Sequence, residues 1–279
     1  MPLRINNTNF GPLNNLNRTD ARLKEVTERL STGQRVNKAK DDAAALAISE
    51  ALRADIRLMD QGVRNASDAV SLLQTAEGGL GQSTDILARM DELAMASGGV
   101  ALSDDERQAL DEEYQQLQSE LDRLAEGTTF NGQKLLDGSF AGKETVIGIQ
   151  GTDADKVTIS IQSNPGPGDQ SFSSTGLGVA GTSIATASGA ESARSSLESA
   201  RSTVLTAVGG LGALQNRFET AVNGLETARE NIMASESQIR DADVALEVTN
   251  LVRERLLSES GRASLIHSNL SNERVLDLL

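Results

Sequence analysis

Apolar residues recur along this chain in two long heptad seams. The first runs from Leu52 to Leu73 in alternating steps of four and three residues, and the same register continues to Ala94 with every second position polar. The second seam keeps the same alternation from Leu197 to Ala242. This spacing places one stripe of a helix against a partner helix. The seams predict one long helix that ends at Gly98-Gly99 and another over about 190–240.

Between the two seams the pattern predicts a shorter helix and a hairpin. Ser103 and Glu106 have the spacing of a capping box, and four–three apolar steps follow as far as Gly127. The period then changes to two, which predicts a β-hairpin at about 143–162. Residues 163–188 are rich in Ser, Gly and Thr and are expected to form an irregular surface loop.

The prolines support a division into two helical arms. All four lie at positions 2, 12, 165 and 167, so the long stretches between them are free of a strong helix breaker. We predict a mainly α fold, in which long antiparallel coiled-coil helices form a rod with one β-hairpin and no large outer domains. The expected domains are residues 1–42 with 241–279, as terminal helices, and residues 43–240, as the rod.

Both ends of the chain carry apolar stripes without a partner in the local sequence. We expect the N-terminal stripe to pair with the C-terminal one, and the remaining apolar surface to be buried against other copies as the ends fold on polymerisation. The residues are Leu16, Leu23, Val26 and Leu30 at one end, and Val244, Val248, Leu251, Val252, Leu256, Leu276 and Leu279 at the other.

A second apolar row lies beside the first seam. Ile86, Met90 and Leu93 again step by four and three, and Arg89 and Glu92 flank them. A helix that packs on one partner needs only one seam. We therefore expect this row to be a surface kept free for another protein, so that an Asp in place of Leu93 would leave the rod folded.

Composition excludes several classes of function. The chain has 279 residues, a formal net charge of −14, no Cys, one His and 2% aromatic residues. This balance argues against nucleic-acid binding, and the missing thiols exclude disulfides and zinc–thiolate sites. No apolar run is long enough to cross a membrane, and residues 1–10 lack the core of a cleavable signal peptide. We expect any export to use a route that needs no such signal.

The residue pattern also offers no catalytic constellation. His267 lies on the C-terminal amphipathic stretch, and the acidic runs at 41–42, 104–106 and 111–113 are typical of helix caps and solvated faces. We expect no enzyme activity, no metal and no cofactor. An acidic coiled-coil enzyme or adaptor remains an alternative that a detected turnover would revive. The pattern favours a structural or interaction protein.

Several motifs resemble those of bacterial flagellins. The resemblance covers about 1–162 and 189–279 in the right order, which implies a short flagellin with only the two filament-core domains. It rests on LSTGQRVNKAKDDAAALAIS at 30–49, ASDAVSLLQTAEGGL at 66–80, TTFNGQKLLDG at 128–138, IRDADVALEVTNLVRERLL at 239–257 and SNERVLDLL at 271–279.

The resemblance implies a function and a set of partners. The chain would polymerise with itself into the extracellular flagellar filament for swimming motility, after export through the flagellar type III apparatus. By resemblance it would also meet an export chaperone, the filament cap and the hook-junction proteins. The alternative within the same superfamily is a hook–filament junction protein, and the LQTAEG stretch favours flagellin.

Two further sites follow from the resemblance. An animal Toll-like receptor recognises many flagellins through residues that correspond here to Arg89, Glu92, Leu93 and Glu113. Recognised flagellins carry a basic residue where this chain has Asp91, so we expect weak receptor activation. Flagellins often carry sugars on exposed Ser and Thr, so the segment 171–188 is a candidate glycosylation surface, with an unmodified loop as the equal alternative.

Overall fold

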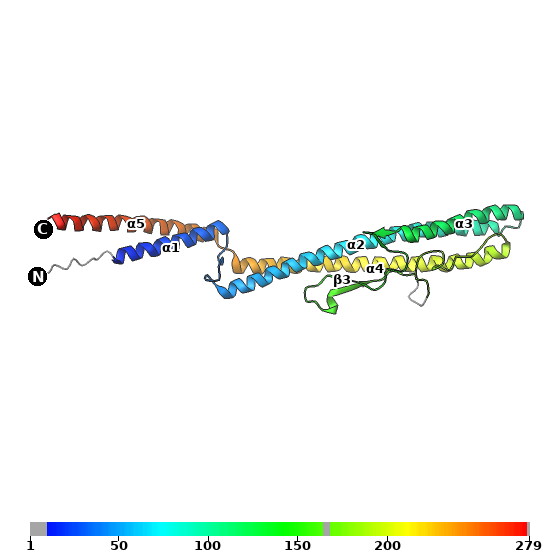
Figure 1. Ribbon diagram of the computed structural model, residues 1–279, viewed down its shortest axis with the longest axis horizontal. Coiled ribbons are helices and arrows are strands. Elements are labelled where there is room, and N and C mark those ends of the chain that lie inside the picture. The colour runs from blue at the N-terminus through cyan, green and yellow to red at the C-terminus, as the bar shows by residue number, and fades with distance from the viewer. Residues whose placement is uncertain (1–9, 164–167, 278–279) are drawn as a thin grey trace. The chain divides into compact units, whose positions relative to one another are not determined.

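The computed structural model describes residues 10–163 and 168–277, and helices dominate this part of the chain (Figure 1). The contacts divide the chain into two compact units, Met1–Ile56 with Glu230–Leu279 and Arg57–Arg229. The predicted domain boundaries at residues 42 and 241 fall at breaks between helices and stay a prediction. The helices are α1 (Phe10–Thr32), α2 (Ala43–Ser97), α3 (Asp104–Gly127), α4 (Ala187–Arg240) and α5 (Val244–Asp277).

The two heptad seams meet in the core of the unit Arg57–Arg229. From Met59 to Ala94 every seventh position of α2 is buried, and α4 contributes buried side chains at matching intervals; the set is Met59, Ala66, Leu73, Leu80, Leu87, Ala94, Leu197, Val204, Leu211 and Phe218. The polar half of the α2 register lies at the margin of the core. There Glu77 accepts a hydrogen bond of 2.8 Å from Gln215 on α4. The seam prediction is confirmed, and its polar positions connect the same two helices.

The row Ile86, Met90 and Leu93 is part of the core, so its prediction as a free surface is wrong. Met90 is fully buried and Leu93 is 3% exposed, in one cluster with Tyr114 of α3. The first turn of α3 forms the predicted capping box at Ser103. Because α2 has two helical neighbours in the unit, α3 as well as α4, it needs two apolar rows.

The predicted hairpin is present as β3 (Lys143–Val146) and β4 (Lys156–Ile159), which pair antiparallel. A second ladder, which the sequence analysis did not predict, joins β1 (Thr129–Phe130) to β2 (Gln133–Lys134). Asn131 and Gly132 turn the chain between them with φ of 48° and 77°. Asn-Gly is the pair that tolerates two successive positive φ angles in a tight hairpin.

The segment after the hairpin is irregular, as predicted, but only part of it lies on the surface, because exposed and buried residues alternate along it. Residues 171–184, here called the strap, anchor fully buried Phe172, Val179 and Ile184 in the core. Ser171 and Ser174 are also buried, so neither offers a glycosylation surface. The abundance of Ser and Gly concealed the apolar anchors between them.

Side chains of α3 hold the backbone of the strap. The Asp122 carboxylate accepts hydrogen bonds from the Ser174 amide at 2.7 Å and its hydroxyl at 3.0 Å. The Gln118 amide donates to the Val179 carbonyl at 2.8 Å, and Asp111 accepts from the Ile184 amide at 2.6 Å. These contacts satisfy backbone groups that an irregular segment would otherwise bury unpaired.

Candidate assembly surface

The two ends of the chain pair with each other, as the apolar stripes predicted. Helices α1 and α5 lie side by side (Figure 1). An antiparallel β-bridge between Gln34 and Asp241 joins the two linkers that precede α2 and α5. The Arg35 amide donates to the Arg240 carbonyl at 2.6 Å, and the Ala242 amide donates to Gly33 at 2.9 Å. These bonds align the start of α5 with the end of α1.

The interface between α1 and α5 contains charged side chains. Arg29 pairs with Glu247 at 3.4 Å, and Arg22 lies 4.0 Å from Glu254. Glu247 is 6% exposed, as buried as Val26, which is 8% exposed on the facing helix. Carboxylates are seldom buried without a partner. The interface therefore uses positions where a helix pair usually places aliphatic side chains.

The apolar side chains of α5 point instead to the outside of the single chain. An exposed apolar row of this length is unusual in a soluble monomer and is typical of a surface that another protein covers. The outer row consists of Val244 (56% exposed), Leu246 (58%), Val248 (42%), Val252 (52%), Leu256 (62%), Leu257 (48%), Ile266 (61%) and Leu270 (49%).

The other predicted terminal residues have different environments. Val26 is buried, and four further members are half-buried, namely Leu16, Leu23, Leu30 and Leu251. The Leu276 side chain and Leu279 lie outside the described residues. Sequence reasoning missed Ile266 and Leu270, which continue the line of Val248 and Val252 five helical turns further on. It also missed Leu246 and Leu257, which lie on another side of the helix, because a four–three count follows one stripe.

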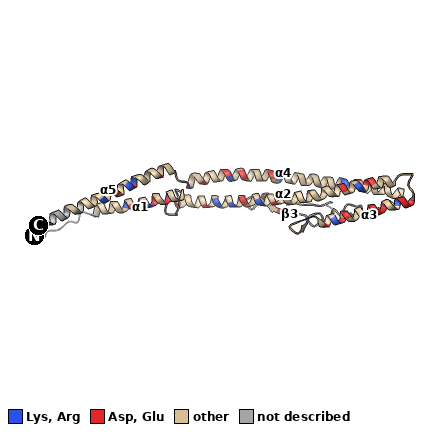
Figure 2. Ribbon diagram, turned by 90° about the horizontal axis from the view of Figure 1, so that it is seen from above, with Lys and Arg blue, Asp and Glu red and all other residues tan. Residues whose placement is uncertain are grey.

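The predicted receptor residues do not all lie on the surface. Arg89 binds Glu113 at 2.8 Å and Glu92 at 2.9 Å; Arg89 and Glu92 are exposed, and Glu113 is half-buried. Hydrogen bonds to Glu113 and Glu92 raise the pKa of the Arg89 guanidinium. Figure 2 shows acidic and basic residues interspersed along α3, where Glu113 lies. Leu93 is buried beneath, so only the charged three share an accessible surface.

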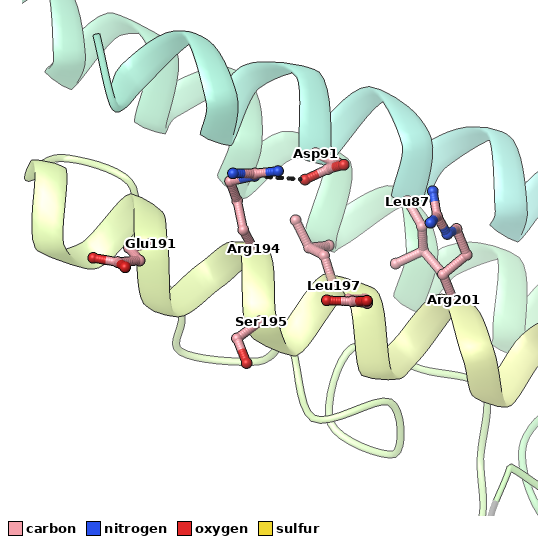
Figure 3. Close-up of a pocket in the computed structure, with 8 residues that line it drawn as sticks. Leu87, Asp91, Glu191, Arg194, Ser195, Leu197 and Arg201 are labelled. Atoms are coloured by element: carbon pink, nitrogen blue, oxygen red, sulfur yellow. Dashed lines mark hydrogen bonds and ion pairs between the residues drawn. The ribbon is translucent and has the colours of Figure 1, made fainter. Parts of the chain in front are cut away.

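Asp91 has a partner that sequence reasoning missed. Its carboxylate accepts a hydrogen bond of 3.2 Å from the Arg194 guanidinium of α4 (Figure 3). The pair lies at an open pocket of about 350 Å³. Acidic and basic side chains both line this pocket. The acidic ones are Asp91, Glu191 and Glu198, the basic ones are Arg194 and Arg201, and Ser195, Leu87 and Leu197 complete the lining. Because Asp91 and Arg194 are 103 positions apart, no local sequence pattern predicts their contact.

Neither a metal centre nor a membrane span emerges from the part of the chain that the structure describes. Within residues 10–163 and 168–277, no three acidic, His or Cys side chains lie close enough to hold a metal ion. The described helices include none with the length and apolar character to cross a membrane. His267 is exposed on α5. The outer row is therefore the feature with the clearest consequence for function.

Comparisons with known proteins also indicate a protein that assembles with other copies. The family model of the bacterial flagellin N-terminal helical region matches residues 6–141, and the C-terminal helical region model matches 193–279. Flagellin of Halalkalibacterium halodurans is 37% identical over 255 residues, which is 91% of each chain. The flagellar filament 31.3 kDa core protein of Treponema maltophilum is 37% identical over 262 residues, 90% of each chain.

A crystal structure of Bacillus cereus flagellin also matches. Its TM-score is 0.49 at 28% identity, with 58% of this chain and 88% of that one covered. The named relatives are flagellins and filament core proteins, and this favours a filament subunit over the hook–filament junction alternative.

Proposed function

Because this chain belongs to the bacterial flagellin family and is a structural subunit of the flagellar filament, we propose that it polymerises through the outer row of α5. The supporting observation is that the α1–α5 pair buries the charged residue Glu247 and leaves the aliphatic residue Leu256 exposed. Burying the exposed half of each aliphatic side chain would contribute about 1 kcal/mol. Eight such residues per copy supply a driving force for association with other copies of the same chain.

One substitution tests this contact directly. Leu256→Asp places a carboxylate in the middle of the outer row, where burial against another copy would leave it without its water. We expect filaments to disappear from negative-stain images and from the sedimented fraction, while far-UV circular dichroism of the free chain is unchanged. Thr206→Asp, which introduces the same residue at an exposed position of α4, is the control. Normal filaments from Leu256→Asp would reject the proposal.

The burial pattern of the α1–α5 pair also supports folding of the two ends on assembly. A helix pair that buries charged side chains, while eight aliphatic side chains of α5 stay exposed, gains only limited stability from burial on its own. In the free chain, hydrogen exchange is expected to be fast over about 1–40 and 242–279, and slow in the filament. Strong protection of these segments before assembly would contradict the proposal.

The finer partners follow from the family. The chain would leave the cell through the flagellar type III apparatus, with an export chaperone, and add beneath the filament cap beyond the hook-junction proteins. Cells that lack the export apparatus should retain the chain inside. Appearance of the chain in the medium of such cells would point to another route.

Receptor recognition is a second proposed interaction, and a weak one. The Arg89–Glu92–Glu113 group offers an accessible charged surface, whereas Leu93 is buried and Asp91 is engaged by Arg194. Asp91→Arg is expected to raise signalling by the free chain in a Toll-like receptor reporter assay. Asp91→Asn separates loss of the ion pair from gain of a positive charge. Equal signalling by both variants and the parent would reject this interaction.

A further inference from the structure

Two ion pairs connect α1 to α5 at heptad spacing. Arg22 and Arg29 are seven residues apart on α1, and their partners Glu254 and Glu247 are seven apart on α5. The pairs therefore form two rungs of an antiparallel ladder, here called the ion ladder. Asp20 extends it, because the Ser258 hydroxyl donates to its carboxylate at 2.8 Å and Arg262 lies 3.8 Å away.

Burial makes the acidic half of the ion ladder sensitive to its partners. The Glu247 side chain is 8% exposed and the Glu254 side chain 13%. Each has one carboxylate oxygen that is buried without a hydrogen-bond partner among the described residues. A buried ion pair contributes little to stability, but removal of one partner leaves an uncompensated charge, which is strongly unfavourable. Such groups destabilise an arrangement that lacks the partner charge more than they stabilise the native arrangement.

Most apolar side chains of α1 do not distinguish one register from the next, although buried Val26 does, because Thr19 lies seven residues before it. Leu16, Leu23 and Leu30 are spaced by seven, so sliding α5 by one heptad replaces one leucine with another. The same slide removes the arginine from either Glu247 or Glu254, depending on its direction. The charges therefore reinforce, further along the helices, the register that Val26 and the β-bridge between Gln34 and Asp241 set near the linkers. Polar groups that specify register at some cost in stability are well attested in coiled coils.

We propose that the ion ladder holds α1 and α5 in register beyond the β-bridge at their linkers, and thereby positions the outer row for docking on the next copy. The inference rests on the proposed polymerisation through the outer row. It assigns to Arg22, Arg29, Glu247 and Glu254 a role in the specificity of assembly rather than in the stability of the free chain.

Charge reversal tests the ion ladder. Arg29→Glu and Glu247→Arg each place like charges at the more buried rung, and each should raise the concentration required for polymerisation at least tenfold. The double reversal restores attraction and should return this concentration to within about threefold of the parent. Lys24→Glu and Glu226→Arg, at exposed positions outside the ion ladder and the outer row, are controls with the same charge changes. Arg22 and Glu254 give an independent second set.

A distance measurement separates register from general damage. The chain has no Cys, so spin labels can be attached at Arg18→Cys and Arg255→Cys, both exposed, and read in filaments diluted with unlabelled chain. A slip of one heptad displaces the labels by about 10 Å along the helix. Assemblies formed by Arg29→Gln or Glu247→Gln should show a second, displaced distance. The double reversal should show the parental distance alone.

The outcomes distinguish the two proposals. If the parent chain forms no filaments, polymerisation through the outer row fails. If the parent assembles and the single reversals behave like their controls, the ion ladder does not act on assembly. A double reversal that assembles no better than the single reversals, or neutral variants with only the parental distance, would overturn its role in register.

Discussion

The pair α2–α4 within Arg57–Arg229 and the pair α1–α5 follow the same heptad rule with opposite results. In the first pair, Leu73 and Phe218 are fully buried in one apolar cluster. In the second, Glu247 is 6% exposed and Leu256 is 62% exposed. The comparison teaches that a heptad pattern predicts a helix with a contact face. It does not say whether the same chain or another copy covers that face.

The difference has a physical origin in the number of neighbours. Helix α2 contacts α4, α3 and the strap in one unit, so both its apolar rows are covered within the chain. Helix α5 has only the shorter α1 beside it among the described residues. A single neighbour leaves most of a helix circumference uncovered, and on α5 that circumference carries aliphatic side chains. The apolar surface of the first pair is covered within the chain, whereas α5 in the second pair keeps an exposed apolar surface.

The largest expected effect on stability comes from a charge placed in the core of Arg57–Arg229. Leu93→Asp buries a carboxylate at a position that is 3% exposed, and the unfolding free energy should fall by several kcal/mol. Thermal unfolding followed by circular dichroism measures it. Met95→Asp, two residues further on and 67% exposed, is the control and should change little. Similar melting of the two variants would mean that the second row of α2 is not part of the core.

Shortening an apolar side chain in the same core should have the next largest effect. Leu73→Ala and Leu211→Ala each leave a cavity in the core, at a typical cost of about 2–5 kcal/mol. Leu205→Ala on α4, where Leu205 is 54% exposed, should cost far less. Denaturant unfolding of the full chain compares the three. If Leu73→Ala or Leu211→Ala unfolds like Leu205→Ala, the register of that helix is wrong.

Release of the strap should cost less, because it removes polar contacts and keeps the apolar anchors. Asp122→Ala leaves the Ser174 amide without its acceptor, and such a loss costs about 1–3 kcal/mol. The Ser174 amide should exchange its hydrogen faster, which mass spectrometry of the strap can follow. Glu126→Ala, at an exposed position of α3, should leave the exchange unchanged. Unaltered exchange in Asp122→Ala would show that the apolar anchors alone hold the strap.

The smallest expected effect is at the start of α3. Ser103→Ala removes the hydroxyl that accepts from the Glu106 amide, and a lost cap costs about 1 kcal/mol. Hydrogen bonds from the Ser103 backbone and hydroxyl lower the pKa of Glu106 below its usual 4.5. Their stabilisation is therefore present above that value and is lost as the pH falls through the lower pKa of the folded state.

Unfolding measured over the acidic range checks the sign of this effect. The difference between parent and Ser103→Ala should shrink as the pH falls and Glu106 becomes protonated. Ser119→Ala, at an exposed position within the same helix, provides a control without a cap. A difference that grows toward low pH would contradict the assignment of Glu106 to the capping box.

The amino-acid sequence alone determined the long helices, the capping box at Ser103, the hairpin near 143–162 and the pairing of the two ends. These features depend on local periodicity and on residues a few positions apart, so they can be predicted from the sequence. The same reasoning predicted apolar side chains on α5 that require a partner. It misjudged Leu93 and the strap, because their burial depends on α3 lying beside α2.

Tertiary structure decided which apolar rows are closed within the chain and which stay open. Burial of Leu93, the Asp91–Arg194 pair and the contact of Glu247 with Arg29 join residues from different helices. Their partners are distant in the chain, and a hydrophobic or charged residue has the same local pattern whichever partner it meets. Periodicity specifies the direction of a side chain around its own helix, and only the packing of the other helices specifies what it meets there.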